Sequence, residues 1–174
     1  VGETVAIVIA DSRYIAEDAA AVVEVDYELL PLVADCRNAV EPGAPPVRRE
    51  LASNVIATYK INFGDSAAAF AKAAHVFHED LWQHRGAGHP IEGRGLLAEY
   101  RAADDSITVW ASTQKSHDLF QSLTSLLDLD EAKLRVVAPD IGGGFGPKLC
   151  VYSEDIAVVA AAKLIRRPIK WIED

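Results

Sequence analysis

The chain has 174 residues, of which 50% are hydrophobic and 25% are charged. This length and composition favour a globular protein of one domain or two small ones, and no apolar run approaches the roughly 20 residues that a membrane span requires. The formal net charge of -9 argues against binding to nucleic acids, because the neutralisation of phosphates requires a basic surface.

The two cysteines, Cys36 and Cys150, are far apart in the sequence. Because no second thiol lies near either of them, the sequence suggests neither a zinc knuckle nor a disulfide framework, and it favours a reducing, cytoplasmic setting. The sequence contains no methionine, and residues 170–174 have a strand pattern that runs to the end of the chain. We therefore expect an internal fragment of a longer protein.

The N-terminal part has the pattern of a β-α-β unit. Residues 5–10 are a continuous run rich in β-branched side chains, which is typical of a buried strand. Asp11 and Ser12 supply capping oxygens for a helix that extends to Ala21. Residues 23–27 alternate apolar and acidic side chains, as a half-exposed strand does.

A proline-rich segment separates this part from the rest of the chain. The three prolines between residues 42 and 46 fix φ and remove amide donors, so the segment cannot continue a helix or a central strand. We therefore predict a linker at residues 41–54, between a piece at residues 1–40 and a second piece at residues 55–174.

The second piece mixes strands and helices. Apolar patterns predict strands at residues 55–63, 76–83, 96–100, 107–112 and 133–137. Helices are predicted at residues 66–74, from Ser116 onward, and at residues 153–163. The helix from Ser116 has an apolar face made of Leu119, Phe120, Leu123, Leu126 and Leu127. The sequence as a whole indicates an α+β fold class.

A glycine-rich loop lies at residues 140–148, between a predicted strand and a predicted helix. Glycines let backbone amides converge and approach an anion or a planar ring closely. The loop fails the dinucleotide-binding fingerprint, because Pro147 stands where a glycine is needed, and no Gly-Lys-Ser/Thr ends the run as in a P-loop. A nucleotide-binding module is therefore disfavoured, and a plain glycine-rich connector is the simplest alternative.

Two other segments are candidates for ligand binding. Gln114 follows the strand predicted at residues 107–112, where a carboxamide can orient a polar ligand, although polar residues at strand ends more often serve the turn. Residues 84–95 are dense in glycine and in titratable groups. Their histidines lack the spacing of known zinc sites, so we expect a structured loop in which Glu92 pairs with an arginine.

The order of these segments resembles one enzyme family. Residues 5–33 are similar to the end of the α/β hammerhead domain in large subunits of the xanthine dehydrogenase, aldehyde oxidase and carbon monoxide dehydrogenase family. A second set of segments resembles, in the same order, the start of the molybdopterin-binding domain of that family. These are residues 64–65, 90–95, 109–114, 139–148 and 167–171. The resemblance implies that the end of a hammerhead domain, at residues 1–40, precedes the start of a molybdopterin-binding domain, at residues 55–174.

The resemblance also implies an activity. It indicates a fragment of an oxidoreductase that acts on an aldehyde, an N-heterocycle or carbon monoxide, with a molybdenum-molybdopterin cofactor that is usually the cytosine dinucleotide form in bacteria. In this family no protein side chain binds the metal. Electrons leave through iron-sulfur clusters and FAD on partner subunits or domains, so the implied partners are these and the remainder of the large subunit.

The family motifs carry roles over to particular residues. Gln114 would face an oxygen ligand of molybdenum, and Gly143, Gly144, Phe145 and Gly146 would lie against the cofactor, with Gln114 and Phe145 also at the reacting centre. Nothing in the sequence matches the general-base glutamate of the family, so we expect the isolated chain to be inactive. The alternative is a non-catalytic cofactor-binding or assembly module from a truncated or split subunit.

The substrate loop of the family lies outside this segment, so the sequence does not determine the substrate, but the residue after the glycine loop argues against purines. In family members that act on purines, a glutamate commonly follows the lysine that matches Lys148, and here that position is Leu149. Leucine cannot hydrogen-bond a purine, which costs about 1 to 3 kcal/mol for each unsatisfied group, unless Leu149 only packs beneath the loop. We expect the parent enzyme to favour carbon monoxide, an aldehyde or a less polar heterocycle. A kcat/KM for xanthine or hypoxanthine above that for every aldehyde tried would contradict this.

Overall fold

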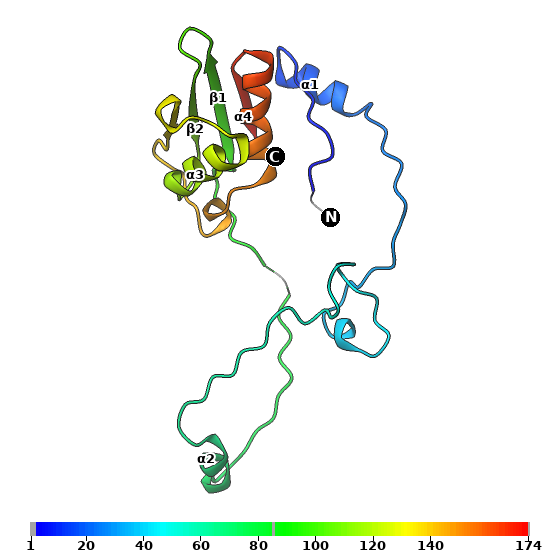
Figure 1. Cartoon of the computed structure of the whole chain (residues 1–174). Helices are drawn as coiled ribbons and strands as arrows, with labels where there is room; N and C mark the ends of the chain where they lie inside the picture. The colour runs from blue at the N-terminus through cyan, green and yellow to red at the C-terminus, as the bar shows by residue number, and fades with distance from the viewer. Residues whose placement is uncertain (1–2, 85, 174) are drawn as a thin grey trace. The chain divides into compact units, whose positions relative to one another are not determined.

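The structure is a computed structural model that describes residues 3–84 and 86–173 (Figure 1). The chain forms two compact units, which we describe separately. The sheet unit contains the described residues of 1–23 and 84–174, and the loop unit contains residues 24–83. Within the described residues, no helix is both long enough and apolar enough to span a membrane.

The sheet unit contains the regular elements that were predicted from residue 96 onward. Its strands are β1 (Gly95–Arg101), β2 (Ser106–Ala111), β3 (Leu134–Val137) and β4 (Ile169–Ile172). Its helices are α1 (Arg13–Ala20), α3 (Ser116–Leu127), η2 (Glu131–Lys133), η3 (Pro147–Leu149) and α4 (Ser153–Ile165). The capping of α1 by the side chain of Ser12 is also as predicted.

The four strands form one mixed sheet in the order β3-β2-β1-β4. Strand β1 runs antiparallel to both β2 and β4, whereas β3 runs parallel to β2. The start of β1 therefore lies at the same end of the sheet as the last residues of β2, β3 and β4. We call this end the site end, because every segment that leaves or enters the sheet there carries residues of the candidate site.

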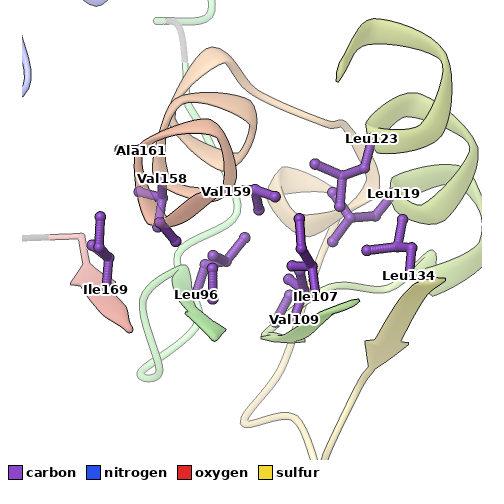
Figure 2. Close-up of a cluster of buried hydrophobic side chains, with 13 residues drawn as sticks. Leu96, Ile107, Val109, Leu119, Leu123, Leu134, Val158, Val159, Ala161 and Ile169 are labelled. Atoms are coloured by element: carbon purple, nitrogen blue, oxygen red, sulfur yellow. The ribbon is translucent and has the colours of Figure 1, made fainter. Parts of the chain in front are cut away.

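Helices α3 and α4 cover one face of the sheet, and the core lies between the two layers (Figure 2). Alternate residues of the strands point into this core, as the period of two in a strand requires. The core residues are Leu96, Ala98, Ile107, Val109, Ala111, Leu119, Leu123, Leu134, Val158, Val159, Ala161, Ala162 and Ile169. The apolar face of α3 is narrower than predicted, because Leu126 is 67% exposed.

The loop unit contains the short helices η1 (Asn38–Val40) and α2 (Ser66–Lys72). The side chain of Asp65 caps α2, as predicted. Within the linker predicted at residues 41–54, the side chain of Asn54 donates to the carbonyls of Ala39 and Pro45. The linker segment is thus locally ordered, and its place as a boundary between domains stays a prediction.

Four predicted strands are wrong. The segments are residues 5–10, 23–27, 55–63 and 76–83, and in the described residues 3–84 none of them pairs in a sheet. Apart from the half-buried Val8, their large apolar residues are exposed, up to 98% for Phe63. A strand pattern in the sequence specifies an extended backbone, but the strand itself forms only where another strand completes its hydrogen bonds.

The assignment of the core can be tested by substitutions at a buried and an exposed leucine of α3. We expect Leu123→Ala to lower the free energy of unfolding by about 2 to 5 kcal/mol, because Leu123 is fully buried between α3 and the sheet and its loss leaves a cavity. The exposed Leu126 of the same helix is the matched control, and Leu126→Ala should change the stability far less. Denaturant unfolding of the three proteins measures both effects, and equal losses would contradict the assignment of the core.

Candidate functional site

Three segments converge at the site end of the sheet. One comprises residues 88–94 before β1, and another comprises residues 112–115 after β2. The third, residues 142–149 before α4, contains most of the glycine-rich loop predicted at residues 140–148, and we call these residues the glycine loop. The backbone amide of Ser112 donates to the carbonyl of Gly95 at 2.9 Å. The amide of Gln114 donates to the carbonyl of Lys148, also at 2.9 Å. The sheet thus brings together segments that are far apart in the sequence.

Glu92 is the residue that joins all three segments. Its Oε2 accepts hydrogen bonds from the Nζ of Lys148 at 2.7 Å, the amide of Gly142 at 2.7 Å and the Oγ of Ser112 at 2.9 Å. Lys148 is only 1% exposed, so its charge is removed from water and depends on this carboxylate. Ser112 follows β2 and the other two donors belong to the glycine loop, so one oxygen of Glu92 fixes both segments to the residues before β1.

The predicted pairing of Glu92 with an arginine is not found among the described residues. Arg94 instead donates to Glu173 at the end of β4, at 2.7 Å from Nη2 and 2.9 Å from Nε. Its guanidinium also lies 3.8 Å from the ring centroid of Tyr152, which caps α4. Arg94 therefore ties β1 to β4 and α4. The other nearby arginine, Arg85, lies outside the described residues.

The surroundings of Glu92 favour its charged form. The hydrogen bond from Lys148 is the main cause, followed by those from the amide of Gly142 and the hydroxyl of Ser112, and together they lower the pKa of Glu92 from 4.5 to about 2. The carboxylate is therefore ionised throughout the physiological pH range. The pKa of Glu173 is lowered in the same way by its hydrogen bond with Arg94.

Gln114 lies directly against the glycine loop. Its Oε1 accepts a hydrogen bond from the amide of Gly146 at 3.2 Å. A Cβ atom at Gly144 would lie 2.3 Å from the Cδ of Gln114, so only glycine leaves room for the carboxamide there. Because the oxygen of the amide is bound to the loop, the NH2 group is the end that is left to donate to a ligand.

The loop itself has an unusual backbone. Gly143 and Gly146 have φ values of 95° and 104°, and Phe145 has a φ of 52°, a conformation that costs a non-glycine residue about 1 to 3 kcal/mol. A Cβ at Gly143 would lie 2.9 Å from Cε2 of Phe145, and one at Gly88 would lie 2.7 Å from its carbonyl oxygen. Close approaches on two sides thus hold Phe145, yet its side chain is 75% exposed.

Comparison with known proteins identifies the family. Residues 47–174 match the model of the molybdopterin cofactor-binding domain. The chain belongs to this family. It is 39% identical to the nicotine 6-hydroxylase large subunit of Paenarthrobacter nicotinovorans, over 100% of this chain and 21% of that protein. It is 36% identical to the carbon monoxide dehydrogenase large chain of Hydrogenophaga pseudoflava, over 99% of this chain and 23% of that protein.

A solved structure agrees with this assignment. Quinoline 2-oxidoreductase from Pseudomonas putida 86 superposes with a TM-score of 0.86 and 33% identity, over 95% of this chain and 21% of that chain. The resemblance stated from the sequence motifs is therefore confirmed, as is the mixed α and β fold. The chain spans about a fifth of the length of these relatives.

The site predicted for this molybdopterin cofactor-binding domain is only part of what the structure brings together. Gln114, Gly144 and Gly146 are in mutual contact, and Phe145 packs against Gly143. The roles predicted for these residues stay predictions. Sequence patterns predicted an ion pair of Glu92 but with the wrong partner, and they assigned no site role to its donors Lys148, Ser112 and Gly142. Gly88, which lies against Phe145, was not predicted either. The one available signal was Lys148, because a lysine among glycines and a proline has few neighbouring side chains and must find its carboxylate elsewhere in the chain.

The pKa of Glu92 predicts how the stability depends on pH. Its folded-state pKa is lowered, so its interactions stabilise the protein above pH 4.5 and weaken as the pH falls toward about 2. We expect Glu92→Gln to destabilise the protein at pH 7, and the difference from the unsubstituted protein to shrink between pH 4.5 and 2. Denaturant unfolding at several pH values tests this, and a difference that does not change with pH would contradict the assigned ion pair.

Proposed function

We propose that this chain is the part of a molybdenum hydroxylase large subunit that presents the glycine loop and Gln114 to the cofactor. The parent enzyme would be an oxidoreductase that acts on an N-heterocycle, an aldehyde or carbon monoxide. The observation that carries the proposal is the carboxamide of Gln114, whose oxygen is bound by Gly146 while its NH2 group is left to donate. The names of the relatives, a nicotine hydroxylase and a carbon monoxide dehydrogenase, support the same class of reaction.

The residues at the site end fit a molybdopterin cofactor. At Gly146 a Cβ would meet nothing within 4 Å, so a planar group or an anion can approach the backbone closely there, and the carboxamide of Gln114 supplies a neutral donor beside it. These residues would hold the cofactor without providing ligands to the metal. When bound, the cofactor supplies the redox chemistry, and the protein supplies binding and orientation.

The chain's own contribution is to position groups. Gln114 would donate a hydrogen bond to an oxygen acceptor at the reacting centre, which orients that oxygen and requires no proton transfer from the chain. The exposed ring of Phe145 would form an apolar wall for the substrate. Leu149 follows the buried Lys148 and is 41% exposed, which fits an apolar contact with a substrate rather than recognition of a purine.

The exposed apolar segments support the remainder of the large subunit as a partner. The chain spans about a fifth of its relatives, and residues 5–10 and 55–63 have strand patterns without a partner strand in the described structure. We propose that these segments complete sheets with other parts of the same subunit, which would also cover side chains such as Phe63.

The finer assignments follow from the same proposal. The relatives are named as a large subunit and a large chain, which supports partner subunits. That these would carry iron-sulfur clusters and FAD is proposed from the family resemblance alone. The cytosine dinucleotide form of the cofactor is proposed from the family resemblance alone. Cys36 and Cys150 are both free thiols, which supports a cytoplasmic location.

The close contact between Gly144 and the carboxamide of Gln114 can be tested by adding one methyl group at Gly144. We expect Gly144→Ala in the intact parent enzyme to displace the carboxamide and lower kcat by about 100-fold, because small displacements at a reacting centre have effects of this size. The matched control is Gly86→Ala, since a Cβ at Gly86 meets nothing within 4 Å and should leave turnover unchanged. Steady-state kinetics and the molybdenum content of each variant are the measurements. Equal turnover of Gly144→Ala and the unsubstituted enzyme would contradict the proposed function.

A further inference from the structure

Lys148 connects the segments before β1 and after β2, one through its side chain and the other through its backbone carbonyl. Its side chain reaches Glu92, in the segment before β1, with 2.7 Å between Nζ and Oε2. Its backbone carbonyl accepts hydrogen bonds from the segment after β2, at 2.9 Å from the amide of Gln114 and 3.3 Å from the Oγ1 of Thr113. Of the described residues, only Lys148 combines a charge with full burial.

The carboxylate of Glu92 holds both ends of the glycine loop. The amide of Gly142 begins the loop and the side chain of Lys148 ends it, and both donate to the same oxygen. The residues between these two points include Gly143, Gly144 and Gly146, which lose more conformational entropy on ordering than other residues do. A loop of this composition takes one conformation only if it is fixed at its ends.

We propose that the Glu92–Lys148 ion pair is a positioning device for Gln114, which sets the direction of its carboxamide by fixing the glycine loop. The pair holds Gly146 where its amide binds the Oε1 of Gln114, and it holds the carbonyl of Lys148 where it binds the backbone of Gln114. Glu92 and Lys148 are therefore positioning residues and need not touch the substrate. This inference rests on the proposed function, because it assigns the pair a role through Gln114.

A purely structural ion pair makes a different prediction from a positioning pair. Lys148 is the buried member of the pair, whereas the side chain of Glu92 is 42% exposed. Removing Glu92 alone leaves the buried charge of Lys148 without a partner, and removing both charges avoids that cost. The double variant Glu92→Gln/Lys148→Met should therefore be more stable than Glu92→Gln alone. It still lacks the bond from Lys148 to Glu92, so the loop and Gln114 should stay misplaced.

The experiment uses the complete parent enzyme with its other subunits, and it compares both variants with a matched control. Asp105→Asn is that control, because Asp105 likewise accepts from a lysine, Lys133 at 3.1 Å, and from a hydroxyl, that of Tyr100 at 3.0 Å. It lies in the hairpin turn between β1 and β2, away from the site end, and its φ of 56° suits asparagine. The measurements are kcat, the melting temperature, and hydrogen exchange of the peptide that contains residues 142–149.

We expect Glu92→Gln and the double variant both to lower kcat by about 10- to 100-fold and to speed exchange in the loop peptide. The double variant should recover most of the melting temperature without recovering kcat. Asp105→Asn should leave kcat and exchange in the loop unchanged. If the double variant recovers kcat together with stability, or if exchange in the loop is unchanged, the pair is not a positioning device.

A further variant separates this inference from the proposed function. Gln114→Ala removes the carboxamide itself, so it should lower kcat while leaving exchange at Gly142 and the melting temperature close to those of the unsubstituted enzyme. If Gln114→Ala has full turnover, the proposed function fails. If it has low turnover but Glu92→Gln behaves like the unsubstituted enzyme in kcat and in exchange, only the role of the ion pair fails.

Discussion

The ion pair between Glu92 and Lys148 is the interaction on which the geometry of the site depends. A lysine that is removed from water requires a partner of opposite charge, and a single oxygen of Glu92 provides it while also binding Gly142 and Ser112. Glu92 precedes β1, and its donors follow β2, in the case of Ser112, or precede α4, in the case of Gly142 and Lys148. The charge therefore determines which turns of the chain lie next to one another.

The sheet makes this interaction possible. Strand β1 pairs antiparallel with β2 and β4, and β3 runs parallel to β2, so one end of the sheet collects the start of β1 and the ends of the other three strands. The core beneath α3 and α4 keeps these strand ends in place (Figure 2). On the edge of the same end, Arg94 binds Glu173 and joins β4 to the start of β1. The fold and the candidate site are thus two consequences of one topology.

The glycine loop shapes the candidate site because its glycines carry no Cβ atoms. The absence of a Cβ at Gly144 admits the carboxamide of Gln114, and the left-handed backbone at Gly143, Phe145 and Gly146 turns the loop around it. A plain connector would not need an exposed aromatic residue in that conformation. This arrangement is the feature of the chain on which the proposed function rests.

Local patterns in the sequence predicted an element correctly where the strands or helices that pair or pack with it belong to this chain. The strands β1, β2 and β3 and the helices α3 and α4 follow from apolar periodicity. The glycine loop and Gln114 were singled out from local patterns, and the order of motifs supplied only the roles that the family resemblance implies. The strands predicted at residues 5–10 and 55–63 failed, because periodicity specifies an extended backbone and not the partner that must pair with it. Only the tertiary structure decided that Glu92 binds Lys148 while Arg94 binds Glu173. The sequence offers Glu92 more than one cation, and the direction that the sheet gives to each side chain decides that Lys148 and not Arg94 is its partner.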